Sequence, residues 1–182
     1  LPAFLGAQGV ANASFLEITP DAQSAGMAGT GLAITDNGST AIFHNASTIA
    51  FSQDVMGASY SYADINKDYG MHSASLFYRI GREGKHGFTV GFRHYKDADF
   101  HWEDGPEDHA RAWNLEAAYF RNIAKNLSVS LTLRYLQAKA YKDADSKGSV
   151  SMDFGASYHR SMAILDEMAS WTIGFQAANL GG

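Results

Sequence analysis

The amino-acid sequence predicts an all-β fold, an antiparallel β-barrel wall of about seven strands that follows an N-terminal plug. Three observations point to this class. From Val55 onward the chain repeatedly alternates apolar with small or polar residues. Aromatic residues make up 13% of its 182 residues, and it contains 18 glycines but only 3 prolines. Alternation with a period of two is the pattern of a strand, and this composition favours strands and tight turns over helices.

Each predicted strand collects its apolar residues on one face. The clearest case covers residues 127–135, where leucine, valine and tyrosine occupy the odd positions and serine, threonine and arginine the even ones. A helix would scatter these residues around its surface. The other predicted strands cover residues 55–64, 69–80, 88–93, 113–119, 149–158 and 171–177.

Residues 1–51 lack this alternation. From residue 14 they are dense in alanine, glycine, serine and threonine, and Gly26, Gly29 and Gly31 are spaced for close backbone approach. We therefore divide the chain into an N-terminal plug or hatch, residues 1–51, and antiparallel barrel strands, residues 52–182.

The first residues raise a question of processing. The sequence Ala-Asn-Ala at residues 11–13 has the form of a signal peptidase site. Because no basic region precedes it, we expect a retained N-terminal segment, with a signal-peptide remnant over residues 1–13 as the alternative.

Segment lengths favour a transmembrane barrel over a soluble sandwich, which is the alternative explanation of the same alternation. The predicted strands reach about ten residues, as in membrane barrels, whereas strands of globular proteins have about five or six. The connections also alternate in length, as in barrels with short periplasmic turns and long external loops. The short ones cover residues 81–85 and 122–126, and the long, charged ones cover residues 97–109 and 142–148.

Two sets of side chains fit a barrel with its short turns in the periplasm and its long loops outside. Tyr78, Tyr119 and Tyr158 lie on the apolar faces near short turns or basic residues, where an aromatic girdle is expected. The opposite face carries charges that make sense only in the lumen of a barrel. These predicted lumen-facing residues are Arg79, Arg93, Glu116, Arg134 and Asp153.

Single-chain bacterial barrels have an even number of strands, so about seven strands predict an incomplete barrel or an eighth strand from the N-terminal region.

Residues 15–27, followed by Gly29 and Gly31, resemble the opening of the PorV and PorQ family of FadL-like outer-membrane barrels. Residues 33–37 and 43–47 are similar to the hatch of that superfamily, and residues 176–181 to its mid-barrel landmark. The hatch motif typically reads Asn-Pro-Ala where this chain has Asn45-Ala46-Ser47. The resemblance implies a barrel of about fourteen strands, of which this chain is the N-terminal half. It also implies hatch residues, which are Gly26, Gly29, Gly31, Asn45 and Ala46.

The resemblance further implies a function in the outer membrane of a Gram-negative bacterium. The family belongs to the type IX secretion system of Bacteroidetes and receives or shuttles secreted cargo. The implied partners are outer-membrane lipid, secreted proteins with C-terminal signal domains and other secretion-system components. A partner-binding loop is expected after the third strand, with Trp102, Glu103, Asp104, Glu107 and Asp108. Two alternatives stay open: FadL-like uptake of hydrophobic small molecules through an apolar lumen, and a structural or adhesive surface barrel.

Composition argues against several other functions. A formal net charge of -5 argues against nucleic acid as a partner, and the absence of cysteine from the sequence removes thiolate metal sites and cysteine nucleophiles. The histidines along the strands have no serine or aspartate partner in a catalytic motif, and the loop acids lack the spacing of a calcium loop. We therefore predict that the chain is not an enzyme and has no catalytic residue, no metal and no cofactor.

Overall fold

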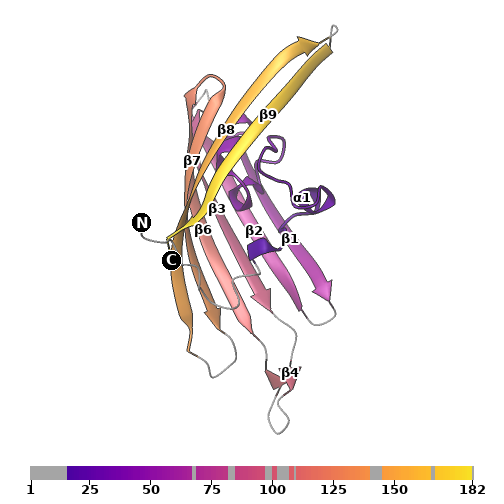
Figure 1. Ribbon diagram of the computed structural model, residues 1–182, viewed down its shortest axis with the longest axis vertical. Helices are drawn as coiled ribbons and strands as arrows, with labels where there is room; N and C mark the ends of the chain where they lie inside the picture. The colour runs from indigo at the N-terminus through magenta and orange to yellow at the C-terminus, as the bar shows by residue number, and fades with distance from the viewer. Residues whose placement is uncertain are drawn as a thin grey trace, which may run out of the picture.

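Seven long antiparallel strands form one curled sheet in the computed structural model (Figure 1). The structure describes residues 16–66, 69–81, 85–96, 100–101, 107–108, 110–139, 145–164 and 167–181. The strands pair in the order β1-β2-β3-β6-β7-β8-β9. Their bounds are β1 Met56–Asn66, β2 Tyr69–Ile80, β3 His86–Lys96, β6 Arg111–Ala124, β7 Leu127–Lys139, β8 Lys147–Ile164 and β9 Glu167–Leu180. The all-β class and the predicted strands are confirmed, and only Val55 falls outside the strand predicted to contain it.

A short hairpin interrupts the longest connection. β4 (Phe100–His101) pairs with β5 (Glu107–Asp108) between β3 and β6, at the end of the sheet opposite the β6–β7 turn (Figure 1). The predicted long connection over residues 97–109 therefore contains these four paired residues. Their pairing satisfies backbone groups that an irregular loop would leave to water.

Alternation along the strands gives the sheet two unlike faces. Along β7 the even-numbered residues from Ser128 to Ala138 are buried, whereas the odd-numbered ones are half-buried or exposed. The buried face, which we call the inner face, is rich in serine, threonine and charged residues. The outer face carries large apolar side chains, of which Phe88, Leu133 and Ile173 are 54%, 54% and 62% exposed. The sheet thus buries its polar face and exposes its apolar one, the reverse of the usual arrangement in water.

The N-terminal segment lies inside the curl of the sheet and covers the inner face (Figure 1). It contains α1 (Ala22–Gly26) and the 3-10 helices η2 (Ala41–Phe43) and η3 (Ala46–Phe51), and its described part, residues 16–51, is the hatch. η3 contacts β6, β7 and β8, and η2 contacts β3 and β6. Among the described residues, no helix combines the length and apolar character needed to cross a membrane.

An apolar core lies between the hatch and the wall. Side chains of η2 and η3 pack against the inner faces of β2 and β6. The buried residues of this cluster are Ala41, Ile42, Ala46, Ile49, Ala50, Phe77, Ala118 and Phe120. Because the outer face contributes nothing to this core, burial of apolar surface holds the hatch to the sheet rather than one sheet to another.

Glycines on the inner face let the hatch come close to the strands. A Cβ atom on Gly174 of β9 would overlap the carbonyl oxygen of Leu32, and one on Gly155 of β8 would overlap the side chain of Asn45. The absence of a side chain at these two positions therefore sets how closely the hatch can approach β8 and β9.

The Gly174→Ala substitution should lower the free energy of unfolding by about 1–3 kcal/mol, because the new Cβ meets backbone that cannot rotate away. Urea unfolding followed by tryptophan fluorescence measures this change. Gly26→Ala is the matched control, since nothing lies within 4 Å of its Cβ position, and it should leave stability unchanged or raise it slightly. Equal losses in the two variants would contradict the close approach at β9.

Candidate functional site

Four buried charges on the inner face form one ion network across four neighbouring strands. Arg93 of β3, Glu116 of β6, Arg134 of β7 and Asp153 of β8 are exposed by 2%, 0%, 6% and 1%. Arg93 Nη2 lies 2.5 Å from Glu116 Oε1, and Arg134 Nη2 lies 3.2 Å from Glu116 Oε2. The same Arg134 nitrogen lies 2.7 Å from Asp153 Oδ2. Two cations and two anions balance, so each buried charge has an opposite partner.

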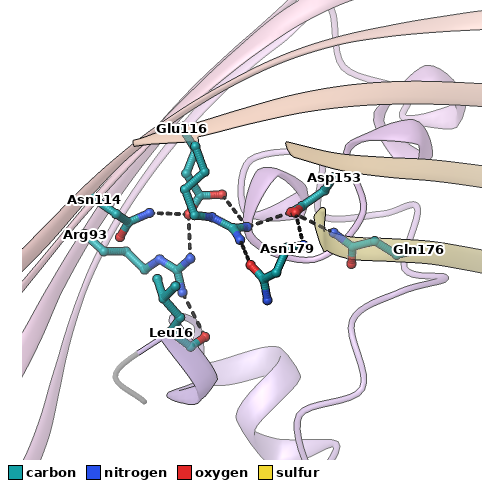
Figure 2. Close-up of polar contacts among 8 residues, drawn as sticks. Leu16, Arg93, Asn114, Glu116, Asp153, Gln176 and Asn179 are labelled. Carbon is teal, nitrogen blue, oxygen red and sulfur yellow. Dashed lines mark hydrogen bonds and ion pairs between the residues drawn. The ribbon is translucent and has the colours of Figure 1, made fainter. Parts of the chain in front are cut away.

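The ion network reaches β9 and the start of the hatch (Figure 2). Asn179 accepts a hydrogen bond from Arg134 Nη1 at 2.7 Å, and its backbone N–H donates to Asp153 Oδ1 at 2.7 Å. Asn179 has a φ of 57°, a left-handed conformation that asparagine tolerates, and lies where the β8–β9 register shifts. Arg93 Nη1 donates to the Leu16 carbonyl oxygen at 3.1 Å. The network therefore ties β3, β6, β7, β8 and β9 to the hatch.

Asn45 joins the hatch to β8 at the start of η3. Its side-chain oxygen accepts hydrogen bonds from Ser47 N at 3.2 Å and Ser47 Oγ at 2.6 Å, which caps the helix. Its side-chain amide donates to the Leu32 carbonyl oxygen at 2.9 Å and to Ser157 Oγ of β8 at 3.0 Å. Ser47 Oγ also lies 2.6 Å from Ser157 Oγ. An amide serves here because it supplies an acceptor for the cap and donors for the wall.

The predicted hatch glycines have three different surroundings. Gly26 ends α1 and has open space at its Cβ position, so the expected close approach is wrong there. Gly29 has a φ of 79°, in the left-handed region that favours glycine. A Cβ atom on Gly31 would overlap the ring of His44. Backbone conformation therefore explains Gly29, and close packing explains Gly31.

Asp21 and His44 make a second polar contact within the hatch. Asp21 Oδ1 accepts from the Ser24 N–H at 2.8 Å, which caps α1, and Oδ2 lies 2.8 Å from His44 Nε2. Burial favours the neutral carboxyl, but the Ser24 N–H and His44 outweigh it and hold the pKa of Asp21 below its ordinary value of 3.8. The sequence signals only half of this pair: Pro20-Asp21 before an alanine-containing turn is typical of a helix cap, whereas no pattern places His44 beside it.

Arg79 lies on the inner face but apart from the ion network. Its guanidinium donates to the carbonyl oxygens of Ser52, Ala50 and Asp54, the last two at 3.3 Å. These carbonyls lie at or just after the end of η3, where a helix leaves acceptors without internal partners. Of the five charges predicted for the lumen, the structure brings four together and places the fifth against the hatch.

Aromatic residues gather on the outer face toward the short turns. The rings of Tyr119 and Phe88 have centroids 5.1 Å apart, and those of Tyr158 and Trp171 are 5.2 Å apart. Tyr78 is 53% exposed and is the register partner of Phe88. The three tyrosines predicted as a girdle therefore share the outer face with further aromatic rings.

A second aromatic level, which was not predicted, lies toward the long connections. Tyr62, His72, His94 and Trp113 are register partners in β1, β2, β3 and β6. The centroids of the Tyr62 and His72 rings lie 4.7 Å apart, and the Tyr60 hydroxyl lies 2.8 Å from His72 Nδ1. Tyr62, His72 and Trp113 lie at positions of the predicted strands that belong to the apolar face, and His94 directly follows the third predicted strand at the matching position. This alternation is the signal that could have found them.

Most of the predicted partner-binding loop lies outside the described residues. Trp102, Glu103 and Asp104 lie outside the described residues. Glu107 and Asp108 form β5 through their backbone, and their side chains are also outside the described part. Within the ranges that are described, no three histidine, cysteine, aspartate or glutamate side chains are placed to hold a metal ion.

No model of a known protein family matches the chain, and no curated protein matches its sequence. The contacts described above connect the hatch to the inner face of the sheet. Hydrogen bonds from Arg93, Arg79 and Asn45 link the hatch to the wall, and the ion pairs join neighbouring strands of the wall to one another.

Replacing Glu116 with alanine should cost about 3–5 kcal/mol of unfolding free energy, because it leaves Arg93 without its carboxylate partner and Arg134 with only Asp153. Urea titration of the folded chain measures the loss. Glu17→Ala removes an exposed carboxylate of the hatch and should leave stability almost unchanged. A Glu116→Ala variant as stable as Glu17→Ala would show that the ion network contributes little.

The Asp21 contact should weaken in acid. Because the folded pKa of Asp21 is lowered, the carboxylate stabilises the fold above its unfolded pKa, and this contribution is lost as the pH falls through the folded pKa. The free energy of unfolding should therefore fall below pH 3.8, and Asp21→Asn should flatten that part of the profile. Asp36→Asn, at an exposed hatch residue, should keep the wild-type profile. Identical profiles for the two variants would remove Asp21 as the cause.

Proposed function

We propose that this chain forms part of the wall of a transmembrane β-barrel in the outer membrane of a Gram-negative bacterium, with the hatch inside it. One observation carries the proposal: the sheet buries its polar face and exposes its apolar one. Leu133 is 54% exposed, whereas Arg134 beside it is 6% exposed. An apolar surface that extends over seven strands needs a covering, and hydrocarbon covers such a surface on all strands at once.

The strand lengths and the outer-face aromatic residues support a bilayer. The seven strands have from 11 to 18 residues, and a tilted strand needs about 9–11 residues to cross the hydrocarbon layer. Tyrosine, tryptophan and histidine gather toward both ends of the sheet, and aliphatic, methionine and phenylalanine side chains such as Val90, Leu133 and Phe154 lie between them. Aromatic belts at the two water interfaces have this arrangement.

Within this class, we propose the PorV and PorQ type of barrel, which receives or shuttles cargo of the type IX secretion system. The sequence resemblance of the hatch supports this assignment. The departure from its Asn-Pro-Ala motif is compatible with the backbone, because Ala46 is the first residue of η3 and Asn45 before it is extended, with φ −152° and ψ 96°. Proline is favoured at the first helical position and requires an extended residue before it.

The inner face favours cargo reception over uptake of hydrophobic molecules. A greasy channel needs an apolar lining. The apolar side chains of the inner face pack against η2 and η3 of the hatch, and the rest of the described inner face is lined by buried serine, threonine and asparagine and by the ion network. A purely structural or adhesive barrel is the remaining alternative, and it predicts no specific partner.

Leu133→Arg should impair insertion into lipid vesicles and cost about 2–4 kcal/mol, because it places a cation on the lipid-facing surface in the middle of β7. Met162→Arg lies on the same face near the β8–β9 turn and is the matched control, expected to insert normally. Insertion is measured by the fraction protected from protease and by urea unfolding in vesicles. Normal insertion of both variants would contradict a lipid-facing β7.

Secreted proteins with C-terminal signal domains should co-purify with the full-length gene product from outer membranes in mild detergent. Replacing residues 102–108 by a Gly-Ser segment of equal length should reduce this capture and leave unfolding unchanged. Asn45→Ala, which acts on the hatch, is the comparison. A barrel that carries bound lipid instead, and loses it in Asn45→Ala, would favour the transporter.

A further inference from the structure

The β8–β9 hairpin extends beyond the strand beside it. β8 pairs with β7 only up to Leu127↔Tyr158, whereas its pairing with β9 continues to Ile164↔Glu167. One more backbone bond, from His159 N to the Asn126 carbonyl oxygen at 2.9 Å, closes the ladder on the β7 side. Figure 1 shows the hairpin, in yellow, reaching past the β6–β7 turn. Among the described residues, only β9 pairs with residues 160–164 of β8.

The orientation of the backbone in this segment follows from the ladder. N–H and C=O groups of alternate residues point to opposite sides of an antiparallel strand. Because the His159 N–H points toward β7, those of Ser161 and Ala163 point the same way, and those of Arg160 and Met162 point toward β9. Among the described residues, no backbone hydrogen bond reaches Ser161 or Ala163 from the β7 side. Both residues are exposed, so this is an accessible strand edge.

A basic hollow borders this edge. It has a volume of about 530 Å³ and lies between the β6–β7 turn and β8. Among the described residues, its lining consists of Lys125, Asn126, Tyr158, His159, Arg160 and Ser161, which include two permanent cations and no acidic side chain. One wall is held in place, because His159 Nδ1 lies 2.9 Å from Thr172 Oγ1 and its ring lies 5.2 Å from that of Phe51 in the hatch.

The proposed membrane orientation leaves this edge in water. Tyr158 and Trp171 mark the aromatic level on β8 and β9, and residues 160–164 lie beyond it toward the short-turn end. Lipid therefore does not cover the edge. An unpaired edge in water is a template for another strand, and basic side chains beside it select an acidic one.

We propose that residues 161–163 of β8, with Lys125 and Arg160, form a docking site for an extended acidic segment of a partner protein, which adds to the sheet as a further strand. The proposal goes beyond cargo reception and uses the membrane orientation only to place the site on the short-turn side. Main-chain hydrogen bonds to Ser161 and Ala163 supply the pairing, and the two cations supply the preference for acidic side chains.

Proline substitutions at two directly paired serines test the pairing. Ser161 and Ser170 are register partners whose N–H groups point away from each other, so proline at either removes no bond within the hairpin. The probe is a fluorescein-labelled nonapeptide of alternating valine with glutamate or threonine, titrated by anisotropy against the whole chain in detergent micelles. Ser161→Pro should weaken binding about tenfold, and Ser170→Pro should leave it unchanged.

A charge reversal tests the acidic preference without touching the backbone. The double variant Lys125→Glu with Arg160→Glu should lose the acidic peptide by more than tenfold and gain affinity for the same peptide with lysine in place of glutamate. Arg121→Glu, at an exposed residue on the outer face of β6, is the control and should bind as wild type.

Hydrogen exchange supplies a direct readout of where the peptide lies. Exchange at the Ser161 and Ala163 amides should slow when the acidic peptide is added, and exchange at Ser170 should not. The docking site is overturned if wild type does not bind, if the two proline variants bind alike, or if binding protects Ser170 instead. None of these outcomes bears on vesicle insertion of Leu133→Arg, so the membrane proposal stands or fails separately.

Discussion

Arg134 donates to Glu116 and Asp153 on the two strands beside it and to Asn179 on β9, and the arrangement of the inner face depends on these contacts. The sheet has large apolar side chains on its outer face and these charges on its inner face, where the hatch covers them and largely excludes water. A buried charge there is costly unless it is paired and hydrogen-bonded. The Arg93–Glu116 ion pair extends this arrangement to β3, so each of the four charges has an opposite charge on a neighbouring strand.

Polar side chains of the inner face also connect the wall to the hatch. Arg93 reaches the Leu16 carbonyl oxygen, Arg79 reaches carbonyls at the end of η3, and Asn45 holds β8. Apolar residues of η2 and η3 fill the space between these polar contacts. The hydrophobic effect therefore holds the hatch to the wall, whereas the outer apolar face takes no part in this contact. Each polar contact specifies position, and the apolar cluster supplies most of the attraction.

The sequence predicts the strands and their faces because a period of two is a local property of each segment. It also predicts that Arg93, Glu116, Arg134 and Asp153 share a face, since parity alone decides this. Which charges meet depends on register, and the Glu116↔Arg134 pairing is set by the β6–β7 turn. Contacts such as Ser47 with Ser157 join residues 110 positions apart, and no local pattern encodes them. Alternation of apolar and polar residues likewise predicts neither the β4–β5 hairpin nor the left-handed backbone conformation of Asn179.

Oxygen and nickel accessibility of spin labels along β7 tests the two-faced wall most directly. The chain contains no cysteine, so labels can be placed one at a time at Ser130, Leu131, Thr132 and Leu133 in lipid vesicles. We expect collisions with dissolved oxygen to be frequent at Leu131 and Leu133 and rare at Ser130 and Thr132, with little access for a water-soluble nickel chelate at any of the four. Access of the nickel chelate to Leu131 and Leu133 would place the apolar face in water and contradict the membrane wall.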